Sequence, residues 1–209
     1  MIKVIIADDH AVIRRGIREI LDETDNIRVV AEAADGNELV DKLLRTKCDV
    51  ILLDINMPGR NGLDVLQDVK KINSNQVVLV LSMYPEEEYA IRALRTGAAG
   101  YLRKDSNPED IIRAVRQVFA GKKHLSADLY DTIIDELRNP EETDPHKKLS
   151  NREREIFLLI GRGRTLSEIS GNLNISPKTV STYRARIMEK MKMKNNAEII
   201  KYVVERGLQ

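Results

Sequence analysis

Short apolar runs alternate with amphipathic stretches through the first 120 residues. Five runs are nearly continuous and rich in β-branched residues or Leu, which is typical of strands buried on both faces. These runs cover Lys3–Ala7, Ile27–Ala33, Val50–Leu53, Val77–Leu81 and Ala99–Leu102. Five stretches with apolar residues at helical spacing follow them, at Val12–Glu23, Gly36–Arg45, Gly62–Ile72, Glu86–Thr96 and Pro108–Ala120. This alternation predicts right-handed crossovers and a doubly wound α/β domain with five parallel strands.

The last 60 residues follow a different pattern, with no strand-like run. Their helix starts are marked by capping residues, which hydrogen-bond the free amides of a first turn. These are Ser150 with Glu153, Thr165 with Glu168, and Ser176 before Pro177. A further helix is expected over about Ala197–Glu205, with Gly207 ending it. This part is therefore predicted to be an all-α domain of four helices.

The two parts are separated by a stretch with a different composition. Residues 139–148 contain two prolines and a run of charges without apolar periodicity, which is typical of a linker. One more helix is expected near Ala127–Leu137, after a cap at Ser126. The predicted organisation is a domain at residues 1–121, a linker with one helix at 122–148, and a second domain at 149–209.

Charge is unevenly divided along the chain, although the net charge of its 209 residues is only +1. There are 20 basic and 27 acidic residues before His146, giving −7, and 14 basic and 6 acidic residues from there on, giving +8. The single Cys48 excludes a disulfide scaffold. The apolar runs are far shorter than the roughly 20 residues of a membrane span, so we expect a cytoplasmic protein without a membrane partner.

Polar residues end four of the five predicted strands. Asp8 and Asp9 follow the first, Asp54 the third, Ser82 the fourth and Lys104 the fifth. Ligands of open α/β sheets bind at the carboxyl ends of the strands, so these side chains converge. Carboxylates without His or Cys ligands favour Mg²⁺. With a Lys and a hydroxyl nearby, such a site is equipped for phosphoryl transfer to Asp54. The alternative is that each Asp only caps a helix.

These motifs resemble those of the receiver domain of bacterial response regulators, which has a flavodoxin-like fold. The matching segments are Ala7-Asp8-Asp9-His10, Leu53-Asp54-Ile55-Asn56-Met57-Pro58-Gly59, Leu81-Ser82-Met83 and Gly100-Tyr101-Leu102-Arg103-Lys104. One departure is Asp105 after the Lys, where many receivers have Pro.

The resemblance implies a role for each matching residue. Asp54 is the expected phosphoacceptor, and Mg²⁺ or Mn²⁺ is held by Asp8, Asp9, Asp54 and the backbone carbonyl of Asn56. The residues expected to respond to the phosphate are Ser82, Lys104 and Tyr101. For Tyr101 the alternative is a simple edge-strand aromatic. His10 is interpreted as a helix-start residue and not as a ligand, because oxygen-ligand sites disfavour imidazole.

A helix, a tight turn and a second helix span residues 165–191, the pattern of a helix-turn-helix. Val180, Ile187 and Met191 mark the buried face of the second helix. The remaining face is basic, which fits either a solvated surface or DNA contact. The candidate DNA-binding residues are Lys178, Thr179, Ser181, Thr182, Tyr183, Arg184, Ala185, Arg186 and Lys190.

This second part resembles the LuxR-type DNA-binding domain. The match lies in residues 149–155, 175–182 and 187–190, and Tyr183 replaces a His frequent in that family. Together the two resemblances identify the chain as similar to NarL/FixJ-type response regulators. They imply double-stranded DNA and a sensor histidine kinase as partners, and a homodimer formed on phosphorylation. The last helix then serves either as a dimer surface or as core.

Two other functions remain open at this point. An enzyme with an aspartyl nucleophile and Mg²⁺ would use the same pocket, but Asn56 stands where haloacid-dehalogenase-like enzymes have their acid/base Asp. We therefore expect no enzyme, apart from self-catalysed dephosphorylation. The other alternative is a regulator that binds DNA constitutively. The opposite charges of the two parts also suggest an unphosphorylated form held closed across the linker.

Overall fold

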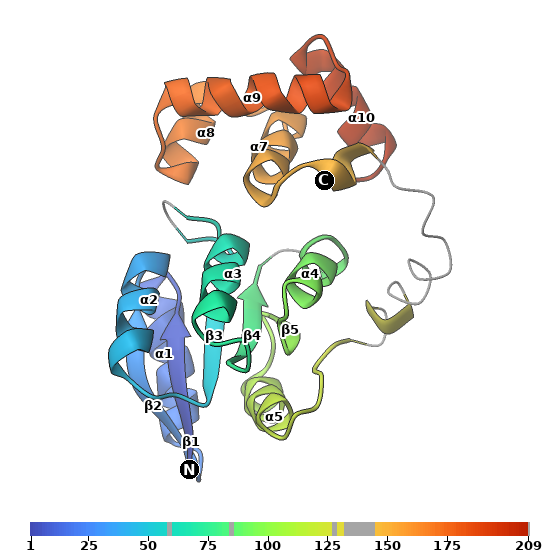
Figure 1. The fold of residues 1–209 in the computed structure, drawn as a ribbon. Helices are drawn as coiled ribbons and strands as arrows, with labels where there is room; N and C mark the ends of the chain where they lie inside the picture. The colour runs from blue at the N-terminus through green and yellow to red at the C-terminus, as the bar shows by residue number, and fades with distance from the viewer. Residues whose placement is uncertain (58–59, 84–85, 127–128, 132–144, 209) are drawn as a thin grey trace. The chain divides into compact units, whose positions relative to one another are not determined.

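The computed structural model describes residues 1–57, 60–83, 86–126, 129–131 and 145–208 (Figure 1). The chain forms two compact units, Met1–Arg138 and Asn139–Gln209. Among the described helices, none is both long and apolar enough to cross a membrane.

The N-terminal unit is built on a parallel sheet of five strands (Figure 1). The strands are β1 (Ile2–Ala7), β2 (Ile27–Ala33), β3 (Val50–Asp54), β4 (Val77–Ser82) and β5 (Gly100–Arg103). Their order in the sheet is β2-β1-β3-β4-β5. This is the doubly wound, flavodoxin-like order, so the predicted fold class is confirmed and the predicted strand limits differ by one residue at most.

Five helices connect the strands and cover both faces of the sheet (Figure 1). They are α1 (Ala11–Asp22), α2 (Gly36–Arg45), α3 (Gly62–Ile72), α4 (Glu86–Arg95) and α5 (Pro108–Phe119). Helices α1 and α5 contribute to one core cluster with side chains from one face of the sheet, including Val4, Leu52 and Leu81. Contacts of α3 with α2 and with α4 line the other face. Burial on both faces explains why the strands are continuously apolar rather than alternating.

Two glycines allow close backbone approaches near the ends of strands. A Cβ on Gly62 would lie 2.3 Å from the carbonyl oxygen of Asp54, because α3 starts directly against the end of β3. A Cβ on Gly100 would lie 2.5 Å from the carbonyl oxygen of His124, which pairs with the free edge of β5. Only residues without a side chain fit these two positions unless the backbone shifts.

The C-terminal unit is all helical, as predicted. It contains a short 3-10 turn η1 (Pro145–Lys148) and the helices α7 (Asn151–Gly161), α8 (Leu166–Leu173), α9 (Pro177–Met191) and α10 (Asn196–Glu205). The expected capping boxes at Ser150 and Thr165 are both formed. Helix α7 packs against α9 and α10, and α8 packs against α9.

The segment between the two predicted domains is only partly described. The hydroxyl of Ser126 accepts a hydrogen bond from the amide of Leu129 at 3.2 Å, so the predicted cap is present. Residues 129–131 are helical, whereas the rest of the expected helix at 127–137 and the linker up to residue 144 lie outside the described residues.

Candidate functional site

The candidate site of the N-terminal unit lies where the order of the strands reverses. Strands β1 and β3 are neighbours at the centre of the sheet, and their carboxyl ends carry Asp8 and Asp54. Both carboxylates are fully buried. Ligands bind at such a switch point in open α/β sheets, and the strand-end prediction therefore placed these two side chains correctly.

A single buried ammonium group joins the two carboxylates. The Nζ atom of Lys104 lies 2.7 Å from Oδ2 of Asp8 and 2.7 Å from Oδ2 of Asp54, and the Lys104 side chain is 2% exposed. The amide of Lys104 donates to the carbonyl oxygen of Ser82 at 2.9 Å, which ties the segment after β5 to the end of β4. Side chains from three strand ends thus meet within ion-pair distance, as the sequence predicts.

Asp54 is held in a poorly hydrated environment. Burial raises the pKa of its carboxyl from the ordinary 3.8 to about 6, although the neighbouring Lys104 opposes this shift. The amide of Asn56 donates to Oδ1 of Asp54 at 3.0 Å. Near neutral pH the carboxyl is therefore ionised and nucleophilic, but its charge is less well stabilised than that of an exposed Asp.

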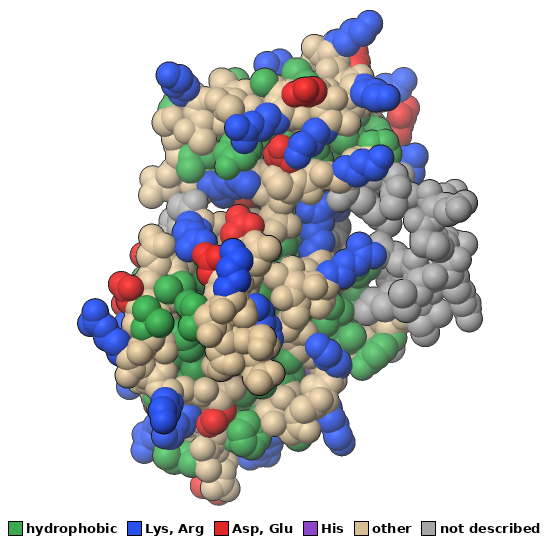
Figure 2. Space-filling view, in the orientation of Figure 1, with side chains coloured by type: hydrophobic (Ala, Val, Ile, Leu, Met, Phe, Trp, Pro, Cys, Tyr) green, Lys and Arg blue, Asp and Glu red, His purple; other side chains and the backbone are tan. Residues whose placement is uncertain are grey.

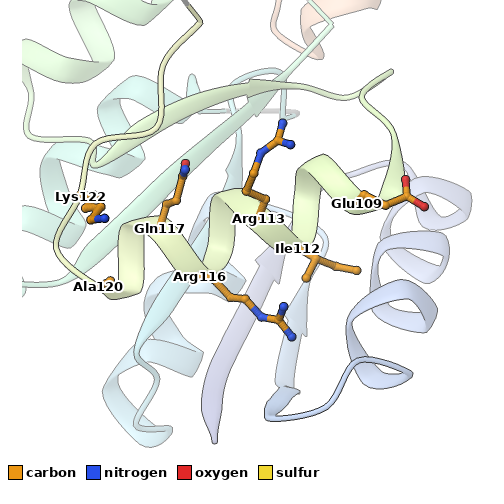
Figure 3. A pocket seen from close by; sticks show the side chains of 7 residues that line it. All are labelled: Glu109, Ile112, Arg113, Arg116, Gln117, Ala120 and Lys122. Carbon is orange, nitrogen blue, oxygen red and sulfur yellow. The ribbon is translucent and has the colours of Figure 1, made fainter.

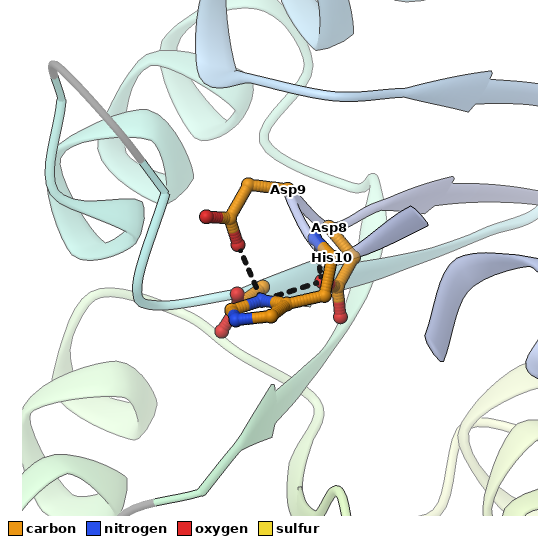
Figure 4. A group of neighbouring side chains, drawn as sticks. Asp8, Asp9 and His10 are labelled. Carbon is orange, nitrogen blue, oxygen red and sulfur yellow. Dashed lines mark hydrogen bonds and ion pairs between the residues drawn. The ribbon is translucent and has the colours of Figure 1, made fainter. Parts of the chain in front are cut away.

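His10 stands at the start of α1, as predicted, but its side chain makes no capping hydrogen bond. The imidazole turns toward the acidic residues instead (Figure 4). Its Nδ1 atom lies 2.7 Å from Oδ1 of Asp9 and 3.4 Å from Oδ1 of Asp8. The sequence analysis did not anticipate this orientation, since the helical pattern alone does not tell where an N-cap side chain points.

The remaining predicted residues of this site lie near it on β4 and β5. Ser82 is the last residue of β4 and is fully buried. Tyr101 lies on the edge strand β5 and is 1% exposed, with its amide bonded to the carbonyl oxygen of His124. Asn56 follows β3, and its side-chain oxygen is buried without a hydrogen-bond partner.

The donor atoms of the site fit a divalent cation. One carboxylate oxygen from each of Asp8, Asp9 and Asp54, with a nitrogen of His10, lie within 4.8 Å of one another. Oδ2 of Asp8 and Oδ1 of Asp9 are buried and have no hydrogen bond of good geometry. Hard oxygen donors of this kind are the ligands that Mg²⁺ and Mn²⁺ prefer.

A groove of 520 Å³ lies apart from this site, along α5 (Figure 3). It is lined by Glu109, Ile112, Arg113, Arg116, Gln117, Ala120 and Lys122. None of the strand-end carboxylates lines it, so it is not part of the candidate chemistry.

Helix α9 of the C-terminal unit carries the predicted helix-turn-helix surface. Val180, Ile187 and Met191 are its buried residues, as predicted from their spacing. The candidate residues that are exposed are Lys178, Ser181, Thr182, Ala185, Arg186 and Lys190. Basic side chains are spread over the visible face of this unit (Figure 2). A groove of 320 Å³ lined by Lys178, Thr182 and Arg186 among others opens near the start of α9.

Several of the candidate DNA-binding residues also hold the domain together. Lys190 Nζ lies 2.6 Å from Glu153 on α7, and Nε of Arg184 donates to Asn196 on α10 at 2.6 Å. The Arg186 guanidinium lies 6.0 Å from the centre of the Tyr183 ring. Such contacts between residues far apart in sequence leave no periodic signal, so the sequence analysis did not separate these residues from freely exposed ones.

An acidic doubly wound domain joined to a helix-turn-helix domain defines a two-domain regulatory protein. Residues 4–116 match the family model "Response regulator receiver domain", and residues 147–203 match "Bacterial regulatory proteins, luxR family". The chain therefore belongs to the response regulators, with a receiver domain and a LuxR-type DNA-binding domain. The family assignment favours a regulator over an enzyme.

Known relatives resemble the chain over nearly its whole length. It is 34% identical to the response regulator UvrY of Escherichia coli K12, covering 100% of this chain and 96% of that protein. It is 37% identical to the oxygen regulatory protein NreC of Staphylococcus epidermidis, covering 99% and 98%. The structure of RcsB from Salmonella enterica serovar Typhimurium, bound to promoter rprA in the presence of phosphomimetic BeF3-, gives a TM-score of 0.65 at 25% identity. That match covers 97% of this chain and 98% of RcsB. Both relatives, like the chain, are NarL/FixJ-type regulators.

Proposed function

We propose that Asp54 accepts a phosphoryl group from a sensor histidine kinase and that this modification switches DNA binding by the C-terminal domain. The observation that carries the proposal is the buried contact of Lys104 with both Asp8 and Asp54. An ammonium at this position can neutralise a phosphoryl oxygen on Asp54 without moving from the site.

The transfer uses groups that the chain already places together. An Asp54 oxygen attacks phosphorus while the bond from phosphorus to the donor's imidazole nitrogen breaks, and that nitrogen keeps the electron pair. Lys104 and the hydroxyl of Ser82 then bind the phosphoryl oxygens. A divalent cation held by Asp8, Asp9, Asp54 and the carbonyl of Asn56 supplies further charge neutralisation when bound. Attack by water on the same phosphorus gives self-catalysed dephosphorylation.

The phosphoryl group adds a charge of about −1.5 to −2 to the end of β3. The proposed response passes through Ser82, Lys104 and Tyr101 and shifts an existing equilibrium between two states of the receiver. In the active state two chains associate and bind two half-sites of double-stranded DNA. The proposed boundaries are a receiver at 1–121, a linker at 122–148 and a DNA-binding domain at 149–209.

The exposed face of α9 is proposed to read the DNA. Ser181, Thr182 and Ala185 are suited to base edges, because methyl groups contact thymine and hydroxyls accept or donate. Lys178 and Arg186 are suited to phosphates, which position the helix rather than specify sequence. Thr179, Tyr183, Arg184 and Lys190 complete the proposed interface.

Phosphorylation with labelled acetyl phosphate and Mg²⁺ tests the acceptor. Wild-type protein should incorporate the label, and Asp54→Asn should not, since an amide is a poor nucleophile. Asp41→Asn is the matched control, because this Asp is exposed on α2 and should leave incorporation unchanged. Full incorporation by the Asp54 variant would exclude Asp54 as the acceptor.

Selection of DNA fragments before and after phosphorylation tests the output. We expect tighter binding to a two-fold symmetric site after phosphorylation. Equal binding in both states would support the constitutive alternative. Steady turnover of a generic phosphomonoester would instead support an aspartyl-phosphate enzyme.

A further inference from the structure

The His10 side chain occupies an unusual position for an N-cap residue. Asn, Asp, Ser and Thr serve at this position because their side chains accept hydrogen bonds from the first turn, and imidazole is not among the preferred groups. His10 makes no such bond, although its backbone is in the extended conformation of an N-cap. Its amide donates to Oδ1 of Asp8 at 2.8 Å, which brings the whole residue against the acidic pocket. The imidazole is therefore directed by the pocket and not by the helix.

The spacing of three donor atoms matches neighbouring ligands of one metal ion. Nδ1 of His10 is 2.7 Å from Oδ1 of Asp9 and 3.4 Å from Oδ1 of Asp8 (Figure 4). Metal bonds of about 2.1 Å place adjacent ligand atoms about 3.0 Å apart in an octahedron and about 3.4 Å apart in a tetrahedron. The observed distances fall around these values before any side chain moves.

The two oxygens of Asp8 have different neighbours. Oδ2 faces Lys104, whereas Oδ1 is on the side of His10. Oδ1 of Asp9 is buried without a hydrogen bond of good geometry, although the imidazole nitrogen lies beside it. This close approach of a nitrogen and an oxygen requires a proton or a cation to balance the two lone pairs. His10 itself is 58% exposed, so an ion can enter and leave from its side.

We propose that His10 is an additional ligand, through Nδ1, that makes the acidic pocket bind first-row divalent transition ions more tightly than Mg²⁺. This inference rests on the proposed cation site of the receiver. Carboxylates alone suit Mg²⁺, whereas an imidazole adds preference along the series from Mn²⁺ to Cu²⁺ and Zn²⁺. The identity of the bound ion, and not only its presence, then depends on His10.

Co²⁺ is a suitable probe because it is a first-row ion with a visible spectrum and a paramagnetic NMR signature. The full chain, free of any purification tag, is titrated with Co²⁺ and separately with Mg²⁺, as wild type and as His10→Asn. Asn retains the ability to cap α1. The variant should bind Co²⁺ about tenfold more weakly or worse, with its Mg²⁺ affinity within about twofold of wild type, as expected for loss of one nitrogen ligand.

Proton NMR of the Co²⁺ complex identifies the ligand directly. Coordination through Nδ1 leaves the proton on Nε2, which should give a hyperfine-shifted resonance that disappears in D2O and is missing from His10→Asn. The matched control is His124→Asn, since Nδ1 of His124 lies 2.6 Å from Gln117, at the far end of β5. This control should keep both the resonance and the Co²⁺ affinity.

Two results would overturn the inference: equal Co²⁺ affinity in wild type and His10→Asn, or a wild-type Co²⁺ complex without the shifted resonance. Either result, together with normal Mg²⁺ binding and normal labelling of Asp54 by acetyl phosphate, leaves the proposed function intact. If wild type binds neither ion, both the inference and the proposed cation site are wrong.

Discussion

Replacing Asp54 with Asn tests the electrostatic state of the pocket through stability. The pKa of Asp54 is raised from 3.8 to about 6 by burial, so the folded state binds a proton more strongly than the unfolded state. The resulting stabilisation is fully present below pH 4 and is lost as the pH rises through about 6. At pH 8 the ionised carboxyl therefore costs about 3 kcal/mol, from about 1.36 kcal/mol for each pKa unit. Asn has no such cost at any pH.

The variant also changes the contact with Lys104, but that change is nearly the same at pH 5 and at pH 8. The difference in unfolding free energy between the variant and wild type therefore isolates the titration when it is compared at the two pH values. At pH 5 about half of the cost is already present, so the variant should gain about 1.4 kcal/mol relative to wild type between pH 5 and pH 8.

Urea unfolding in EDTA, followed by circular dichroism, measures this difference. Asp41→Asn serves as the control, because its exposed carboxyl should give no pH-dependent gap. A gap for Asp54→Asn that stays constant from pH 5 to pH 8 would refute the reasoning, since it would mean that Asp54 is already ionised at pH 5. Added Mg²⁺ at pH 8 should then narrow the gap, because ligands that bind only the folded state stabilise it.

Three further changes address other parts of the structure. Gly62→Ala should cost about 1–3 kcal/mol in urea unfolding and slow labelling by acetyl phosphate, because its Cβ would lie 2.3 Å from the Asp54 carbonyl oxygen; wild-type stability would contradict this contact. Lys178→Ala should weaken binding to all DNA sequences alike and reduce the salt slope by about 0.9, whereas Lys201→Ala on α10 should keep the slope; an unchanged slope for Lys178→Ala would argue against its phosphate contact. Ser150→Ala should lower the stability of the C-terminal unit by about 1 kcal/mol in thermal unfolding, and an unaltered midpoint would show that the capping box contributes little.

Local and periodic signals were sufficient to predict the elements. Residues 36–45, 62–72 and 177–191 form helices with the predicted limits, because caps and apolar spacing are properties of neighbouring residues. The meeting of Asp54 and Lys104 also followed from sequence, since parallel strands bring their carboxyl ends to one edge. The family resemblance supplied the individual roles.

Contacts that depend on packing could not be predicted in the same way. Lys190 and Glu153 are separated by 37 residues and pair across two helices, so no spacing rule connects them. The orientation of the His10 imidazole depends on one amide bond to Asp8, and the closeness of Gly62 to β3 depends on where a helix axis settles. Each of these is fixed by three-dimensional arrangement after the elements have formed.

The position of Lys104 also has a mechanical consequence. It follows β5, which has four residues, lies at one edge of the sheet and pairs with β4 on one side and with a single residue, His124, on the other. The carboxylates that it holds belong to the two central strands. An altered grip on this ammonium therefore loads the least restrained strand, while the centre of the sheet stays stiff. The sheet works as a rigid mount with one compliant margin, and a local change of charge becomes a displacement there.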